Sequence, residues 1–258
     1  MAKAAVRIAL LGAGGRMGQA VLEAASGQAD VRIVAALVRV GSPLLGTDFQ
    51  GLKYSTDIEA AVADCDVVLD FSLPESTALT LKACVAAGKP LVTGVTGMDA
   101  GLKAALQAAR KSIPVLAAPN MSLGVALLTR MAEKAAAVLG PDFDIEILEA
   151  HHKHKKDAPS GTALALGEVV SKARGVPAPD KTTDRSGARR AGSIGYSVVR
   201  AGDIVGEHTV LFVGAGERLE LTHRAQSRQS FAKGALTAAR WIAGKPAGIY
   251  VLADTLGS

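Results

Sequence analysis

A glycine-rich turn near the start of the 258-residue chain joins an apolar segment to an amphipathic one. The apolar segment, Val6–Leu11, is typical of a buried strand, and the stretch at 16–26 is typical of a helix. Between them stands Gly12-Ala13-Gly14-Gly15-Arg16-Met17-Gly18, where close-approaching backbone and a helix N-terminus would bind a pyrophosphate. This order predicts a dinucleotide-binding turn. The alternative is a tight turn that binds nothing.

The same alternation continues through the first half of the chain. Further buried strands are expected at 32–37, 67–71, 91–93 and 115–117, and further helices at 74–87 and 100–111. Strands that alternate with helices indicate βαβ units, and therefore a Rossmann-like α/β domain with a parallel sheet.

The order of elements changes after Asn120. The sequence predicts a long helix from Ser122 to Leu139, a strand at 144–150, a loop at 151–159 and a helix at 160–174. Residues 175–191, rich in Pro, Gly, Asp and Arg, are expected to form a mobile surface loop. Consecutive antiparallel strands are then expected at 196–200, 205–213 and 218–224, before a helix at 231–243. These elements predict a second, smaller α+β domain with a mixed or antiparallel sheet.

Composition excludes several classes of protein. Hydrophobic residues make up 49% of the chain, enough to form a core, which argues against disorder. No apolar run approaches the roughly 18 residues of a membrane span, so no membrane partner is expected. Two cysteines are too few for a disulfide framework and indicate a cytoplasmic protein. A net charge of +5 permits anionic ligands but does not indicate a nucleic-acid partner.

The end of the second predicted strand bears on which dinucleotide is bound. In NAD-binding proteins, a carboxylate about 20 residues after the glycines accepts a hydrogen bond from the ribose 2′-hydroxyl. Here the strand ends in Leu37-Val38-Arg39, and Arg39, with Arg16, offers positive charge to a 2′-phosphate. The sequence therefore favours NADPH, with NADH as the second choice. The alternative is that Arg39 is a solvated charge at a strand end.

Two more loops follow predicted parallel strands, where ligands bind in open α/β sheets. They are Gly94-Val95-Thr96-Gly97 and Ala118-Pro119-Asn120-Met121-Ser122, and their backbone and hydroxyl groups would meet a nicotinamide carboxamide.

The segment from Glu149 to Thr162 holds three of the five histidines and three lysines. At its end, Gly161 and Thr162 would present backbone N–H groups at a helix start, a cradle for a carboxylate. His152, Lys153 and Lys155 add positive charge, so the expected ligand is a small polyanion. Histidine, or a lysine among like charges, can also supply a proton near neutral pH.

Three other interpretations of this basic segment compete. His151, His152 and His154 would form a zinc site, but the flanking lysines repel a dication and neither a cysteine nor an acidic ligand stands nearby, so no metal is expected. A phosphate-backbone patch for nucleic acid would need more basic residues and stacking aromatic residues. A solvated charge run is the remaining alternative.

Taken together, these segments resemble the 4-hydroxy-tetrahydrodipicolinate reductase (dihydrodipicolinate reductase) family over essentially the whole chain. The similar motifs are Gly-Ala-Gly-Gly-Arg-Met-Gly at 12–18, Glu-Ala-His-His at 149–152, Lys-Lys-Asp-Ala-Pro-Ser-Gly-Thr at 155–162 and Arg-Ala-Gly-Asp-Ile-Val-Gly-Glu-His at 200–208. The resemblance implies transfer of hydride from NAD(P)H to C4 of a cyclic unsaturated imine, with loss of water. The resulting enamine is then protonated at the neighbouring carbon. The resemblance further implies that the substrate is a small dianionic heterocycle of diaminopimelate and lysine biosynthesis.

The resemblance also implies roles for single residues. His151 matches the catalytic proton donor and acceptor, and Lys155 matches a second proton donor. Positions that hold the substrate carboxylates match His152, Gly161 and Thr162. The matching cofactor contacts are Gly12, Ala13, Gly14, Gly15, Arg16, Met17, Arg39, Gly94, Val95, Thr96, Ala118, Pro119, Asn120 and Met121. The chain departs from the family at Val38, where many members have an acid beside the arginine.

For the whole molecule, the resemblance implies a nucleotide-binding domain at 1–122 and 232–258, since the C-terminal helix rejoins it. Residues 123–231 would form the substrate-binding domain, and its sheets would build a homotetramer. A cleft between the two domains would close to exclude water during the transfer. Two alternatives remain: another NAD(P)-dependent imine reductase or amino-acid dehydrogenase, and a sensor that binds NADPH without turnover.

Overall fold

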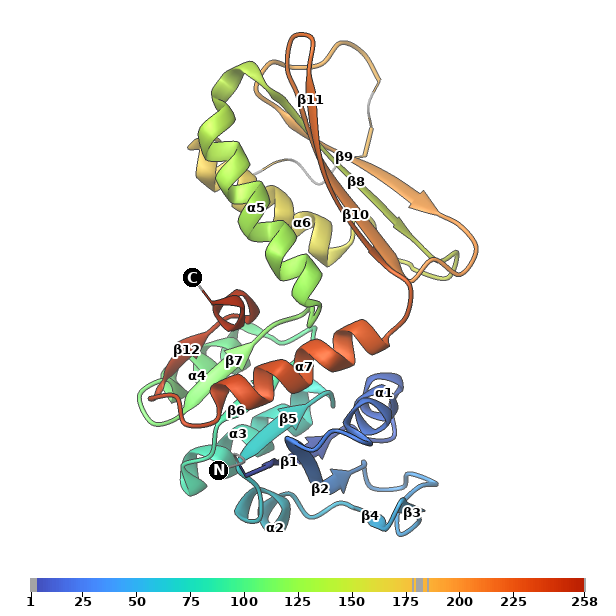
Figure 1. The fold of residues 1–258 in the computed structure, drawn as a ribbon, viewed down its shortest axis with the longest axis vertical. Coiled ribbons are helices and arrows are strands. Elements are labelled where there is room, and N and C mark those ends of the chain that lie inside the picture. Colours follow the sequence, from blue (N-terminus) through green and yellow to red (C-terminus); the bar gives the residue numbers. More distant parts are fainter. Residues whose placement is uncertain (1–3, 178, 180–182, 185, 258) are drawn as a thin grey trace. The chain divides into compact units, whose positions relative to one another are not determined.

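The computed structural model describes residues 4–177, 179, 183–184 and 186–257, and the chain divides into two compact units (Figure 1). The first unit comprises the described residues up to Leu123 and from Arg228 onward. The second comprises the described residues of Gly124–Ser227. The chain therefore passes from the first unit to the second and back again.

An eight-stranded sheet forms the centre of the first unit, in the order β12-β7-β6-β5-β1-β2-β4-β3. All neighbouring strands pair in parallel except β3 and β4, which form an antiparallel hairpin. This confirms the predicted parallel sheet. The strands are β1 (Val6–Leu11), β2 (Val31–Leu37), β3 (Asp48–Phe49), β4 (Leu52–Ser55), β5 (Val67–Asp70), β6 (Leu91–Thr93), β7 (Pro114–Ala117) and β12 (Gly248–Tyr250).

Helices cover both faces of this sheet, as the buried, continuously apolar strands require. On one face, α2 (Ile58–Ala63), α3 (Pro74–Ala87) and α4 (Ala100–Ala109) share one apolar core with the sheet. On the other face, α1 (Arg16–Ala25) packs beside α7 (Gln229–Ile242), which also contacts β1, β5, β6 and β7. The short helix η2 (Leu252–Leu256) contacts α7. The helix α7, which follows the second unit in the sequence, thus helps to cover this face of the first sheet.

The second unit is a four-stranded mixed sheet with two helices on one face. Its strands are ordered β11-β10-β8-β9. Ile147, Tyr196 and Phe212 point from the sheet into a core that also contains Leu128 and Leu166 of the two helices. The elements are α5 (Leu123–Leu139), η1 (Gly140–Asp142), β8 (Asp144–His151), α6 (Gly161–Arg174), β9 (Ile194–Arg200), β10 (Gly206–Val213) and β11 (Arg218–Ala225).

The prediction that the last three strands pair consecutively is wrong for β9. β10 and β11 do form an antiparallel hairpin, but β9 pairs in parallel with β8 at the opposite edge of the sheet. The inserted strand β8 separates β9 from β10. The reason is the helix α6, which follows β8 and provides the crossover that a parallel pair needs. Together, β8, α6 and β9 form a βαβ unit.

The outer face of the second sheet is apolar in part. Leu148, Val199 and Val213 are exposed, and each is an odd number of residues from a buried residue of its own strand. Because side chains alternate along a strand, these three lie on the face opposite the helices.

The surface loop expected at 175–191 falls partly on residues 178, 180–182 and 185, which lie outside the described residues. Its described residues form neither helix nor strand. Arg189 joins this segment to β8: it forms an ion pair with Glu146 and donates a hydrogen bond of 2.9 Å to the carbonyl of Ile145. Across the part of the chain that the structure describes, the helices all lack the length and apolar content for crossing a membrane.

Candidate active site

The predicted cofactor residues lie at one edge of the first sheet. The chain order reverses between β1 and β5, and in parallel sheets a ligand binds at such a switch point, outside the carboxyl ends of the strands. The loops that leave β1, β2, β6 and β7 at this edge, together with the first turn of α1, hold all the predicted cofactor residues. They are Gly12 to Met17, Arg39, Gly94 to Thr96 and Ala118 to Met121.

Two positions of the glycine turn have no room for a side chain. Gly12 has a φ of 72°, and a Cβ there would overlap the carbonyl group of Phe71. A Cβ on Gly18 would overlap the carbonyl oxygen of Gly12. Gly15 is the N-cap of α1 and carries no side chain, so a ligand can approach the first helical turn directly. The turn fits the pyrophosphate of a dinucleotide.

The end of β2 lies against this turn. The N–H of Ala13 donates a hydrogen bond of 2.9 Å to the carbonyl of Leu37. Val38 is buried, and its Cγ1 lies 3.3 Å from the place that a Cβ on Gly14 would occupy. Arg39 follows and is exposed. An apolar side chain therefore stands where an acid would meet a ribose, with a cation directly beside it.

A further wall of this edge, the loop after β5, is missing from the sequence prediction. The carbonyl of Phe71 lies against Gly12, and its ring lies where a Cβ on Gly94 would be. Asp70 fixes this loop: its buried carboxylate accepts hydrogen bonds from the Ser72 N–H at 2.9 Å and the Thr77 hydroxyl at 2.7 Å. Burial raises the pKa of Asp70, and these hydrogen bonds partly offset that effect. The sequence did contain a signal for this loop. Phe71 is the last residue of a predicted parallel strand, and the other loops predicted to bind the cofactor also follow such strands.

The second unit holds the predicted catalytic and substrate-binding residues. His151 is the last residue of β8, so it lies on the strand and not in the loop that was expected to begin there. The ammonium group of Lys155 lies 2.9 Å from a carboxylate oxygen of Asp157. His152 is half-buried, and its ring centroid is 6.2 Å from that of His154.

The helix α6 begins at the end of the basic segment, as predicted. Ser160 is its N-cap, and the hydroxyl accepts a hydrogen bond of 3.2 Å from the N–H of Ala163. Gly161 is exposed, with open space where a Cβ would be, and Thr162 follows in the first turn. An anion can therefore approach this helix N-terminus, where the helix dipole favours negative charge.

A buried carboxylate lies behind His151. Glu149 is fully shielded from solvent, and its Oε2 is 2.6 Å from Nδ1 of His151. Arg200 binds both oxygens of Glu149 at 2.7 Å, and the N–H of Ser160 donates to Oε1 at 2.9 Å. Burial raises the pKa of Glu149, but the hydrogen bonds from His151, Arg200 and Ser160 outweigh it and lower the pKa to about 2.

His208 completes this cluster from β10. It is buried, its ring meets that of His151 edge to face with centroids 5.2 Å apart, and its Nε2 is 3.0 Å from the Ser160 hydroxyl. Burial, together with the nearby charge of His151, lowers the pKa of His208 to about 4. Glu149, Arg200 and His208 were not among the predicted site residues. The available signal was the spacing of Glu149 and His151, which places both on one face of a strand.

The histidines that the sequence analysis weighed as a zinc site are His151, His152 and His154. Nδ1 of His151 is engaged by Glu149. Within the described residues, His, Cys, Asp and Glu side chains do not gather in groups of three that could hold a metal ion.

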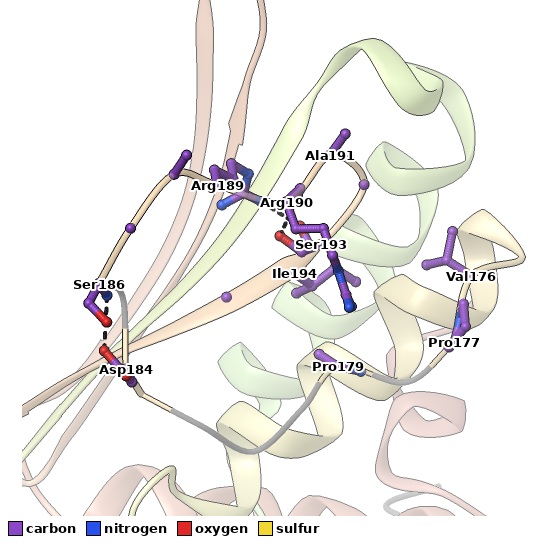
Figure 2. A pocket seen from close by; sticks show the side chains of 14 residues that line it. Val176, Pro177, Pro179, Asp184, Ser186, Arg189, Arg190, Ala191, Ser193 and Ile194 are labelled. Carbon is purple, nitrogen blue, oxygen red and sulfur yellow. Dashed lines mark hydrogen bonds between the residues drawn. The ribbon is translucent and has the colours of Figure 1, made fainter.

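A pocket of about 620 Å³ also lies in the second unit, but it contains none of the predicted site residues. It is lined by residues between Val176 and Gly195, and Figure 2 shows Arg189, Arg190 and Ser193 on one wall with the hydrogen-bonded pair Asp184 and Ser186 beyond them. The candidate active site is therefore the cluster around His151, and not this pocket.

Comparisons with known proteins match both halves of the chain. The family model for the N-terminus of dihydrodipicolinate reductase matches residues 6–121, and the model for its C-terminus matches residues 124–256. The 4-hydroxy-tetrahydrodipicolinate reductase of Alkalilimnicola ehrlichii is 50% identical over 97% of this chain and 98% of its own length. The enzyme of the same name from Thiobacillus denitrificans is 47% identical over 98% of both chains.

Solved structures agree with these matches. The dihydrodipicolinate reductase of Paenisporosarcina sp. TG-14, solved with dipicolinate bound, has a TM-score of 0.78 and 25% identity, covering 96% of this chain and 97% of that chain. An amine dehydrogenase from Mycobacterium smegmatis shares the fold, with a TM-score of 0.60 and 14% identity over 96% of this chain and 95% of that chain.

Proposed function

The chain belongs to the dihydrodipicolinate reductase family, and we infer from this that it is a 4-hydroxy-tetrahydrodipicolinate reductase. It is an NAD(P)H-dependent oxidoreductase that yields tetrahydrodipicolinate, in diaminopimelate and lysine biosynthesis. The observation that carries this conclusion is identity of about half the residues to enzymes of that name over nearly the full length.

We propose that the first unit binds the cofactor through the glycine turn and the loops beside it. The fit rests on the tight turn that Gly12 and Gly18 allow, where a Cβ would overlap the protein's own backbone, and on Gly15, the N-cap of α1, which has no side chain to block a pyrophosphate from the helix N-terminus. NADPH is favoured because Arg39, assisted by Arg16, offers charge to a 2′-phosphate and Val38 offers no acceptor to a 2′-hydroxyl. When bound, the reduced nicotinamide supplies the hydride to C4 of the substrate.

We propose that the second unit binds the dianionic substrate and supplies the proton. His152 and the first turn of α6, at Gly161 and Thr162, hold the carboxylates. His151 and Lys155 then protonate the carbon next to C4 after hydride transfer. The support is geometric: these residues border the start of α6 and the end of β8 within one unit.

The oligomeric state and the location are also part of this proposal. The exposed apolar side chains Leu148, Val199 and Val213 make the outer face of the second sheet suitable for a homotetramer contact. Cys65 and Cys84 are both free and buried, which is the usual state in a reducing cytoplasm.

The decisive experiment is a coupled assay. Pyruvate, aspartate semialdehyde and the preceding synthase generate the unstable substrate, and NADPH oxidation is followed at the nicotinamide absorbance band. We expect oxidation that depends on the synthase and is lost in the His151→Ala/Lys155→Ala double variant, which still binds NADPH. Oxidation only with other cyclic imines would indicate a different imine reductase. Binding of NADPH without any oxidation would indicate a sensor.

A further inference from the structure

Strand geometry brings three polar side chains together beneath the second sheet's helices. Glu149 and His151 are two residues apart on β8, so they share one face of the strand. The parallel pairing of β9 with β8 aligns Arg200 with His151. The three side chains therefore converge because of the pairing that β9 makes at the edge of the sheet.

Every acceptor position of the Glu149 carboxylate is used. Oε2 is bound by Nδ1 of His151 at 2.6 Å and by Nη1 of Arg200 at 2.7 Å. Oε1 accepts from Nη2 of Arg200 at 2.7 Å and from the N–H of Ser160 at 2.9 Å. A carboxylate has about four acceptor sites, so this one is saturated and its orientation is fixed.

We propose that Glu149 is a positioning residue for the proton transfer: held by Arg200, its carboxylate keeps the His151 proton on Nδ1 and leaves Nε2 to exchange a proton with the substrate. An ionised carboxylate only accepts hydrogen bonds, so the nitrogen that faces it must be the donor. This inference rests on the proposed role of His151 in the reduction.

The same carboxylate also positions the substrate cradle. Its Oε1 holds the N–H of Ser160, the N-cap of α6, one residue before Gly161. Glu149 thus fixes the proton-donating ring relative to the helix N-terminus where a substrate carboxylate would bind. Orientation of this kind contributes to rate because the reacting groups need no rearrangement.

The surroundings of the His151 ring keep it in this place. The His208 ring lies against one side, and a Cβ on Gly206 would lie only 3.1 Å from Nε2. The other titratable or charged groups near the ring are Glu149 on its own strand, Arg200 on β9, His223 on β11 next to His208, and Lys155 and Asp157 in the loop.

The test is the Glu149→Gln variant, which keeps the shape of the side chain. Its amide oxygen in place of Oε1 can still accept from Ser160 and from Nη2 of Arg200. Its NH₂ group in place of Oε2 then faces Nδ1 of His151, so the histidine proton is driven to Nε2, and it also displaces the Nη1 donor of Arg200. We expect kcat to fall about 10²-fold or more, with the KM for substrate and for NADPH within about threefold of the wild type. Nitrogen-15 NMR of histidine-labelled protein should show the proton on Nδ1 in the wild type and on Nε2 in the variant.

Glu146→Gln is the matched control. It lies on the same strand and is paired with Arg189, but it does not contact His151. We expect kcat near that of the wild type in this control. Arg200→Lys is a second variant that keeps the positive charge but removes the two-point grip on Glu149, and about a tenfold loss of kcat is expected. If Glu149→Gln does not fold, the kcat of Arg200→Lys tests the positioning role of Glu149 in its place.

The outcomes separate this inference from the proposed function. Unchanged turnover in Glu149→Gln or in Arg200→Lys, with turnover lost in His151→Ala, overturns the positioning role, and so does an equal loss in Glu146→Gln. If the wild type itself does not oxidise NADPH in the coupled assay, the proposed function fails. The NMR experiment then still tests the geometry, because a wild-type proton on Nε2 overturns it and one on Nδ1 supports it.

Discussion

His208 shows how burial of one residue sets a pH dependence for the whole fold. Its pKa is lowered from 6.5 to about 4, chiefly by burial, so the folded protein keeps this ring neutral. As the pH falls below 6.5, the unfolded chain takes up a proton that the folded protein does not accept until about pH 4. The free energy of unfolding therefore falls over this window, by about 2 kcal/mol at pH 5 relative to pH 7.

Denaturant unfolding at pH 7 and pH 5 tests this prediction. The His208→Gln variant should lose less stability between the two pH values than the wild type does. His223, whose pKa is also lowered by burial, is present in both proteins, and Glu149 titrates at lower pH. An equal loss in both proteins would contradict the assignment to His208.

Arg39 is a single-residue test of cofactor choice. Removing its charge in Arg39→Ala should raise the KM for NADPH about tenfold or more, because the proposed charge-assisted contact to the 2′-phosphate would be lost, and should leave the KM for NADH nearly unchanged. Arg32→Ala is the matched control, since Arg32 is exposed near the start of β2, at the opposite end of the strand from Arg39. A similar rise in the KM for both cofactors in Arg39→Ala would show that Arg39 does not bind the 2′-phosphate.

At the scale of elements, α7 packs against the loop after β7, where the cofactor is proposed to bind, through one glycine. A Cβ on Gly234 would overlap the carbonyl oxygen of Met121, in the loop after β7. Gly234→Ala should therefore displace the helix or the loop, lower the free energy of unfolding by about 1–3 kcal/mol and raise the KM for NADPH. Gly101→Ala in α4 is the control, because its Cβ would meet only the Asp99 side chain at an ordinary 3.4 Å. Equal melting temperatures for Gly234→Ala and Gly101→Ala would contradict the close packing of α7 against the loop after β7.

Elements with a strong local pattern could be predicted from the sequence, and those defined by pairing could not. The alternation of strands and helices identified β1, β2, β5, β6 and β7. Six short elements were missed because two to six residues carry too little periodicity: β3, β4, α2, η1, β12 and η2. The partner of β9 was missed because pairing depends on the crossover through α6, not on the residues of β9 alone.

The same distinction applies to the candidate site. The glycine turn and the histidine–lysine segment are continuous in sequence, so their chemistry could be predicted locally. Glu149 was visible in that segment, but its function depends on Arg200 and Ser160, which only the folded sheet and helix bring to it. His208 came from a third strand, and no local pattern marks it as a neighbour of His151.

At the scale of the whole molecule, the outer face of the second sheet determines the expected assembly. Leu148 sits in the middle of this face, opposite Thr209 and Ser197 on the adjacent strands. Leu148→Lys should split the proposed tetramer into smaller species, since a buried unpaired charge is costly. Light scattering after size exclusion should give about four times 26.3 kDa for the wild type and less for the variant.

Val138→Lys provides the comparison for this experiment. Val138 is more exposed than Leu148 and lies on α5, away from the outer face of the sheet. The same substitution there should leave the mass unchanged. An unaltered mass in Leu148→Lys, or a wild type of 26.3 kDa, would contradict assembly through this face.

The return of the chain to its first unit has a consequence for biosynthesis. The wall that α7 supplies to the nucleotide-binding sheet is made more than 100 residues after α5 begins. On the ribosome, the four strands that α7 covers, β1, β5, β6 and β7, therefore keep an apolar surface uncovered while the whole intervening unit is translated. That nascent intermediate exposes the apolar surface on which a chaperone would act, and the nucleotide-binding sheet is complete only after β12 has been synthesised.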